Sequence, residues 1–150
     1  MKFEIPRSLK MEHEQLHDML RQATQEPGEV GDAAKGVARL MHPHFVKEEE
    51  FALPPLGLLR KLAQGELTPD MKDVLALTDR LKAELGAMLE EHKLIVAALD
   101  RLSAAAKSAN KTEYVDFAHA LKLHAQTEED VAYPAAILIG EYLREKLAAR

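Results

Sequence analysis

The sequence predicts an all-α protein that forms an antiparallel up-down four-helix bundle with short extra helices. Apolar residues recur at the three- and four-residue spacing of one helix face through most of the 150 residues. Strand-like alternation of apolar and polar residues is absent, and prolines and glycines divide the chain into four long stretches with short loops. Because short loops join neighbouring helices, consecutive helices are expected to run antiparallel.

The first half of the chain is predicted to hold two long helices. The first spans about residues 8–25, and the second spans about residues 29–52 before the prolines at 54 and 55 stop it. Pro43 lies inside the second helix, where proline removes one hydrogen bond at a cost of roughly 3 kcal/mol. A kink is therefore expected just before His44.

The third helix is predicted to open at Thr68 and Pro69, which form a cap followed by proline at the first helical position. Its apolar pattern continues to about Lys107. At ~1.5 Å per residue such a helix would be longer than its neighbours, so we expect a break near Gly86.

The fourth helix is predicted to begin with a capping box, formed by Asn110 with Glu113 three positions later. Pro134 is expected to end it. Short helical tails, at about residues 57–64 and 135–147, are expected to follow the two proline stops.

Composition limits the function. A chain of 150 residues with 47% hydrophobic residues fits one domain, and a formal net charge of −5 without a basic block argues against nucleic acid as a partner. No apolar run is long enough for a membrane span, and the N-terminus carries Glu and Pro where a signal peptide is apolar, so we expect a cytoplasmic protein. Because there is no cysteine, a bound metal would need His and carboxylate ligands, with Tyr as an outside alternative.

A repeat directs attention to particular residues. The segment HFVKEEEFALP (44–54) recurs as HAQTEEDVAYP (124–134), with His, Glu, Glu, Ala and Pro at the same positions. EHEQL (12–16) likewise recurs as EHKLI (91–95). The single domain, residues 1–150, is thus predicted to consist of two half-repeats, approximately 1–66 and 67–150, related by a pseudo-twofold axis.

The repeated residues are of the types that bind metal ions. His44 and Glu48 are four positions apart, so they lie on one face of a helix and point at one place, and the second copy does the same. The predicted metal-site residues are His13, His44, Glu48, His92, His124 and Glu128. Two bridging carboxylates with terminal histidines suit two ions ~3.5–4 Å apart. This donor set favours iron, with manganese or zinc as alternatives.

An ordinary surface pair is the competing interpretation, since a His with a Glu at i+4 is a common exposed pair worth only ~0.2–0.5 kcal/mol. A solvated face, however, has no reason to repeat His, Glu and Pro in register in both halves. The repeat therefore favours metal ligands.

In this order, EHEQL, HFVKEEEFALP, EEHKLI and HAQTEEDVAYP resemble the hemerythrin-like, or HHE, domain family over essentially the whole chain. The resemblance implies a four-helix bundle with a non-haem di-iron centre that binds or reacts with dioxygen, or in some members with nitric oxide or peroxide. It makes the four histidines terminal ligands and Glu48 and Glu128 the bridges. Ferritin-like bundles use Glu-x-x-His, which is the opposite order.

The chain departs from the reversible oxygen carriers of that family, which have five histidines, two of them a turn apart on the third helix. Here Val96 stands one turn after His92, and the extra histidine is His17, one turn after His13. His17 is either a fifth histidine ligand or a partly exposed side chain.

One possible ligand grouping follows from that extra histidine. If His13, His17 and His44 bind one iron, the other iron keeps only His92 and His124 beside the bridges. The open position would then lie on this second iron, with Val96 leaving room for a diatomic ligand.

The remaining polar candidates are expected to play no direct part. His42 and His119 should face away from the centre. Glu49 and Glu129, each directly after a bridge, are expected on a solvated face, with a supporting contact to the site or a replacement ligand as the alternative.

Three function classes remain. The first is a small protein that binds or senses dioxygen at two iron ions. The second detoxifies nitric oxide or peroxide or repairs iron centres, and it is less favoured because repair proteins of the family often carry a cysteine-containing N-terminal segment. In the third the metal is structural. Whether the protein is an enzyme, and which protein partner it has, the sequence leaves open.

Overall fold

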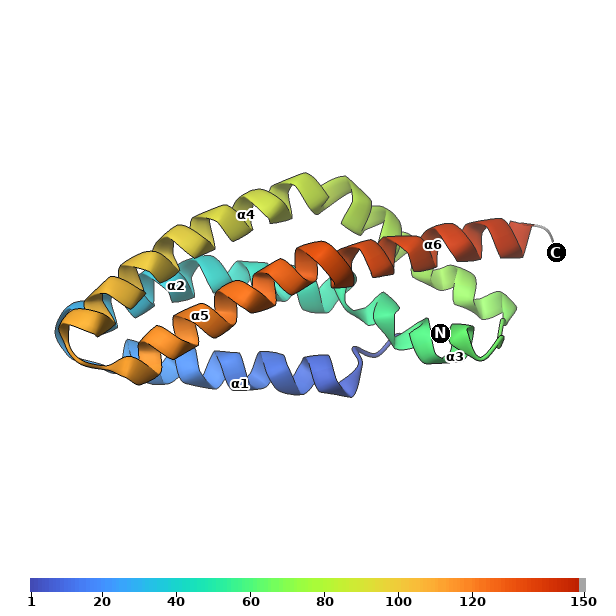
Figure 1. Ribbon diagram of the computed structural model, residues 1–150. Helices are drawn as coiled ribbons and strands as arrows, with labels where there is room; N and C mark the ends of the chain where they lie inside the picture. The colour runs from blue at the N-terminus through green and yellow to red at the C-terminus, as the bar shows by residue number, and fades with distance from the viewer. Residues whose placement is uncertain (149–150) are drawn as a thin grey trace.

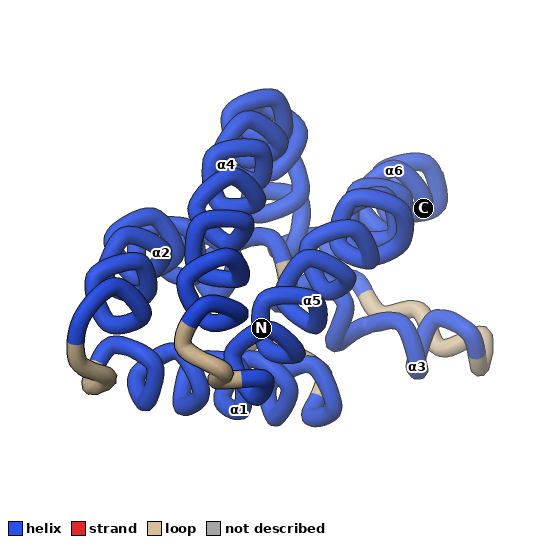
Figure 2. The backbone as a smooth tube through the Cα atoms, turned by 60° about the vertical axis from the view of Figure 1, so that its left-hand side comes forward, coloured by secondary structure: helices blue, strands red, loops and turns tan. Residues whose placement is uncertain are grey.

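The computed structural model describes residues 1–148, and within that range the chain is all-helical, without strands. The long helices are α1 (Arg7–Thr24), α2 (Gly28–Lys47), α4 (Leu75–Ser108), α5 (Thr112–Thr127) and α6 (Tyr133–Ala148). Figure 1 shows them as a helical bundle, and Figure 2 shows that only short loops connect them. The predicted all-α class is confirmed.

Short helical turns complete the chain. They are η1 (Glu48–Ala52), η2 (Pro54–Leu58), α3 (Leu59–Ala63), η3 (Pro69–Val74) and η4 (Glu128–Ala132). Both η1 and η4 are π-helical turns, and each directly continues the long helix before it. No helix within residues 1–148 has both the length and the apolar character that a membrane crossing requires.

The first two long helices agree with the prediction to within a few residues. Pro43 lies inside α2 without ending it. Thr68 is the N-cap residue of η3, and Pro69 is its first residue, as the sequence indicated.

The expected break near Gly86 is wrong. Helix α4 runs without interruption for 34 residues, and Figure 1 shows that it arches over the bundle. A Cβ atom on Gly86 would meet nothing within 4 Å, so no close approach requires glycine there. The extra length of α4 packs against α6, where Gly140 lies against Thr78.

The predicted capping box is also wrong. Asn110 has a left-handed φ of 56° and ends α4 instead of beginning α5. The Lys111 amide donates to the Ala106 carbonyl at 2.8 Å and the Asn110 amide to that of Lys107 at 3.2 Å, which is a Schellman motif. The N-cap position of α5 is Lys111, without a side-chain cap.

Pro134 does not end a helix, contrary to the prediction, because η4 carries α5 directly into α6. In this turn the Tyr133 amide donates to the Glu128 carbonyl, five residues back. The wider π-helical turn accommodates the following proline without ending the helix. In the first half, the Leu53 amide makes the equivalent bond to Glu48 at 2.9 Å, but there the chain turns away through η2.

Two apolar cores lie on either side of a polar layer. One core joins α1, α2 and α5 to the C-terminal half of α4, and includes Leu20, Met41 and Leu102. The other joins η1, η2, η3 and α6 to the N-terminal half of α4, and includes Phe51 and Leu143. The repeated histidines and glutamates of the sequence fall between these two cores.

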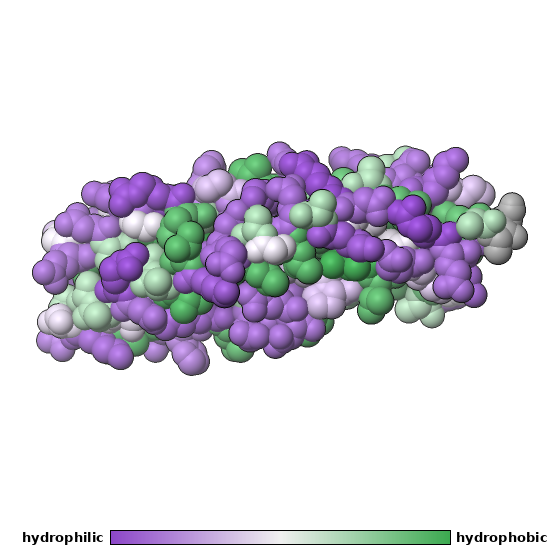
Figure 3. Space-filling model, turned by 90° about the horizontal axis from the view of Figure 1, so that it is seen from above, coloured by the Kyte–Doolittle hydropathy of each residue, from purple (hydrophilic) through white to green (hydrophobic). Residues whose placement is uncertain are grey.

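The surface is mixed in character. The face in Figure 3 is largely hydrophilic, with apolar side chains interspersed. The most exposed large apolar side chains include Leu94, Leu123, Val131 and Leu138. Such scattered residues are ordinary on a protein surface.

Candidate metal centre

The polar layer between the cores contains all six predicted ligands of the repeat. Their relative exposures lie between 0% and 8%, although all are polar or charged: His13, His44, Glu48, His92, His124 and Glu128. They come from α1, α2, η1, α4, α5 and η4. Burying so many titratable groups together costs free energy unless they are paired or bind cations.

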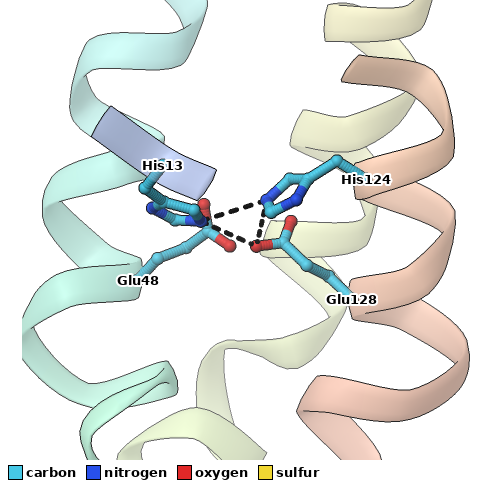
Figure 4. A group of neighbouring side chains, drawn as sticks. All are labelled: His13, Glu48, His124 and Glu128. Atoms are coloured by element: carbon cyan, nitrogen blue, oxygen red, sulfur yellow. Dashed lines mark hydrogen bonds and ion pairs between the residues drawn. The ribbon is translucent and has the colours of Figure 1, made fainter. Parts of the chain in front are cut away.

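The six side chains form two overlapping groups. In each group, four donor atoms lie within 4.8 Å of one another. One group holds His13 and His124, the other holds His44 and His92, and Glu48 and Glu128 belong to both. Figure 4 shows the first group, in which the side chains of His13 and Glu48 point toward those of His124 and Glu128, which lie on the continuous helix of α5 and η4.

Glu128 connects the two groups with its two oxygen atoms. Its Oε2 lies 3.1 Å from His124 Nε2 and 3.5 Å from His13 Nε2, while its Oε1 lies 3.3 Å from His92 Nε2. Glu48 Oε1 lies 3.5 Å from His44 Nε2 and has no hydrogen-bond partner among the described residues. This geometry suits carboxylates that bridge two cations.

Three further carboxylates orient the histidines from outside the layer. The Nδ1 atom of His44 donates to Glu91 at 2.8 Å, and that of His92 donates to Glu129 at 3.0 Å. His124 Nδ1 donates to Glu12 in the same way.

Sequence reasoning did not find Glu12 or Glu91, although each directly precedes a repeated histidine. Glu129 makes the supporting contact that was the alternative for it, and its side chain is still 31% exposed. Lys47 in turn donates to Glu91 at 2.7 Å, and this hydrogen bond raises the pKa of Lys47 despite some burial.

For three of the four histidines, these bonds indicate which ring nitrogen is turned toward the layer. A neutral imidazole that donates from Nδ1 carries its lone pair on Nε2. The Nε2 atoms of His44 and His92 nevertheless face each other at 2.9 Å, and those of His13 and His124 at 3.0 Å. At such distances either one ring donates a hydrogen bond to the other, or the two nitrogen atoms act as neighbouring ligands of one cation. The donor set therefore fits metal ions.

The electrostatics of the layer also favour bound cations. Burial and the charge of Glu128 hold the pKa of Glu48 well above its usual range. Burial by itself would raise the pKa of Glu128, but hydrogen bonds from Glu48 and the histidines hold it well below. Burial lowers the pKa of His92 and His124, yet bonds to Glu128 outweigh it and raise both. The layer thus attracts positive charge, which metal ions would supply.

Tyr133 is a polar member of the layer that the sequence did not single out. It is fully buried, and its hydroxyl donates to Glu48 Oε2 at 2.9 Å. The same oxygen lies 3.3 Å from the Nε2 atoms of both His44 and His92. Desolvation by burial, followed by the charges of Glu48 and Glu128, raises its pKa. The tyrosine one position before the second repeated proline was the signal for it.

Other candidates lie outside the two groups. His17 is exposed and stacks on Phe45, with ring centroids 5.6 Å apart. His42 and His119 are exposed, as expected. Glu49 is exposed as well, on the solvated side predicted for it.

The histidine pairs in the structure also differ from the possible grouping of His13, His17 and His44 on one iron. The close pairs are His13 with His124 and His44 with His92. Val96 is only half-buried, and the small cavity beside His92 is lined by Ile95 instead. The open position expected beside Val96 therefore has no support in the structure.

A comparison with protein families matches residues 4–136 to the family described as hemerythrin HHE cation binding domain. Neither the comparison with curated proteins nor that with solved structures gave a match.

Proposed function

The chain belongs to the hemerythrin HHE cation-binding family, and from this premise we propose that it is a non-haem di-iron protein that binds or senses dioxygen. His13, His44, His92 and His124 would hold the two ions, with Glu48 and Glu128 between them. His17 is left out of this set because it is exposed and stacked on Phe45.

One observation carries the proposal. Two pairs of Nε2 atoms face each other at 2.9–3.0 Å, and both pairs share the same two buried carboxylates. A single ion would not use both pairs, whereas two ions use every donor. Nitrogen-rich, thiolate-free donor sets of this kind suit iron, with manganese or zinc as alternatives.

The proposal includes the arrangement of the chain. We take the domain, residues 1–150, to be an antiparallel up-down bundle of two half-repeats, about 1–66 and 67–150. Support comes from the two π-helical turns, each of which begins at a bridging glutamate and precedes a proline.

The residues around the ions would set their reactivity. Iron supplies reversible redox chemistry and an open coordination position for a small ligand. Glu12, Glu91 and Glu129 hold three of the imidazoles in one tautomer, and the two apolar cores exclude bulk water from the layer.

Metal analysis with optical spectra tests the proposal, on anaerobic, aerobic and nitric-oxide-treated samples. We expect iron, with an absorption band that appears with dioxygen and disappears on deoxygenation. Catalytic loss of nitric oxide or peroxide would instead establish the detoxification alternative. A tightly bound, spectroscopically silent zinc would establish a structural metal.

A further inference from the structure

The two ends of the metal centre differ in what lies beside them. At the His44–His92 end, the Tyr133 hydroxyl stands within 3.3 Å of both Nε2 atoms. In the repeat, the residue 80 positions before Tyr133 is Leu53, which has no polar group. The two ends are thus chemically unequal.

The space around the two ends differs as well. The cavity that touches both His44 and His92 also touches His124 and Glu128, and it measures about 10 Å³. That volume is at the lower limit of ~10–15 Å³ needed for one water molecule. A further ligand therefore does not fit in this cavity unless side chains move.

A much larger cavity reaches the other end. It measures about 450 Å³, lies between α1 and α5, and is lined by His13, His124 and Glu128 of the centre together with Leu53. A diatomic molecule is comparable in size to water, whose share of liquid volume is ~30 Å³. Such a ligand fits this cavity without any rearrangement.

The residues that line this cavity indicate which kind of ligand can enter it. Its apolar lining includes Leu9, Leu16, Met19 and Leu123. No lysine or arginine is among its lining residues, and Glu12 adds a carboxylate to the wall. Apolar walls with a carboxylate favour a small uncharged molecule over an anion.

We propose that dioxygen, or an uncharged diatomic molecule like it, reaches the metal centre through the cavity between α1 and α5 and binds at the His13–His124 end. Tyr133 closes the opposite end. This inference rests on the di-iron function proposed above, and adds to it the ligand-accepting position and the route.

The first test narrows the cavity from its surface. Leu123 lines the cavity and is 63% exposed, so Leu123→Trp adds bulk there without disturbing a core. The anaerobic, iron-loaded variant should bind nitric oxide severalfold more slowly in stopped-flow absorbance, with iron content unchanged. Leu138→Trp is the matched control, since Leu138 is 66% exposed and lies on α6 away from this cavity.

The second test introduces a tyrosine at the His13–His124 end, as a counterpart of Tyr133 at the other end. Leu53→Tyr places in the first half-repeat the residue that the second half has, and the cavity beside Leu53 offers room for it. This variant should keep its iron and lose most nitric-oxide binding. If it fails to fold, the Leu123→Trp measurement still decides.

The outcomes separate the two proposals. Iron-loaded Leu123→Trp protein that binds nitric oxide as fast as the parent overturns the route, while the di-iron assignment stands. A parent chain that retains no iron overturns the proposed function, and this inference with it.

A separate observation concerns His13. Its Nδ1 atom is buried and has no hydrogen-bond partner among the described residues, unlike the Nδ1 atoms of the other three histidines. A buried polar atom without a partner destabilises the folded state. A fourth acceptor, for His13 Nδ1, would give all four histidines the same support.

The repeat identifies that acceptor. Glu129 accepts from His92, and the residue 80 positions before Glu129 is Glu49. Glu49 is exposed, and it lines a cavity of about 270 Å³ together with His13. We infer that Glu49 turns into this space, accepts the Nδ1 hydrogen of His13 and positions the imidazole for its metal ion.

Competition with a chelator tests this positioning role. Glu49→Gln should weaken iron retention about 10–100-fold, the usual effect of losing such a partner, whereas Glu50→Gln in the same turn should not. In a His13→Ala background, Glu49→Gln should have no further effect. An equal additional loss in that background would overturn the pairing, because Glu49 would then act independently of His13.

Discussion

At the scale of single residues, the centre depends on carboxylates that act at two distances. Glu128 offers one oxygen to each histidine pair, while Glu12, Glu91 and Glu129 hold imidazoles from behind. His44 with Glu48 and His124 with Glu128 were predictable because each pair recurs at a fixed helical spacing, and His13 and His92 because a Glu-His element recurs in both halves. Glu12 and Glu91 were not, because their partners lie on other helices and no spacing within one helix reports such a contact.

Loss of a bridging carboxylate should empty the centre. Glu128→Ala is expected to lose most bound iron, because it removes one oxygen from each end of the site. The helices should remain, since both apolar cores stay intact. Asp130→Ala is the control, as Asp130 lies in the same turn but is exposed, and within residues 1–148 it accepts a side-chain hydrogen bond from Gln126 alone. Iron analysis and circular dichroism provide the measurement, and full iron content in Glu128→Ala would refute the bridging role.

Loss of a carboxylate that supports a histidine should weaken iron binding less than loss of a bridging carboxylate. Glu91→Gln keeps a hydrogen-bond acceptor for His44 but removes the charge that both His44 and Lys47 face. We expect the iron dissociation constant to rise about 10–100-fold. Glu90→Gln changes the neighbouring residue, whose side chain is 69% exposed and, among the described residues, forms an ion pair with Lys93 alone. Equal affinities for the two variants in chelator competition would contradict a role for Glu91 in the site.

At the scale of elements, the π-helical turns η1 and η4 begin at Glu48 and Glu128 and place these two side chains in the layer. The sequence predicted the helices well because their apolar faces repeat regularly. It failed at Gly86, at Asn110 and at Pro134, where tertiary packing or a local hydrogen-bond pattern decides. Gly86 is compatible with a helix, Asn110 adopts a left-handed conformation to end one, and a π turn accommodates Pro134.

A pair of glycine substitutions tests how α4 and α6 pack. A Cβ atom on Gly140 would lie 2.2 Å from Thr78 Oγ1, so Gly140→Ala should destabilise the protein by about 1–3 kcal/mol. Gly86→Ala meets nothing and should instead stabilise α4 by roughly 0.5–1 kcal/mol. Urea denaturation of both variants provides the free energies of unfolding. Equal effects of the two changes would mean that the contact between Gly140 and Thr78 is not close.

At the scale of the whole molecule, the buried polar layer divides the apolar interior in two. Without cations, that layer buries four imidazoles and two neighbouring carboxyl groups, which disfavours the folded state. Because metal ions bind only the folded arrangement, they should stabilise the fold as well as provide its chemistry.

Metal removal should therefore lower stability without unfolding the bundle. An ion present at 100 times its dissociation constant adds about 2.7 kcal/mol. Thermal unfolding followed by circular dichroism, with and without a chelator, should show a lower midpoint for the metal-free chain and similar helix content at low temperature. The Glu128→Ala variant should be insensitive to chelator. A midpoint that does not change in the parent chain would show that the layer is stable without ions.

The central claim is that the layer holds two ions that share Glu48 and Glu128. Anaerobic titration of the metal-free chain with ferrous iron, with bound metal counted after removal of the excess, tests it most directly. We predict that the parent chain retains two equivalents per chain and that Glu128→Ala loses most of both. Retention of one equivalent or none by the parent, or of two by the variant, would contradict a carboxylate-bridged pair.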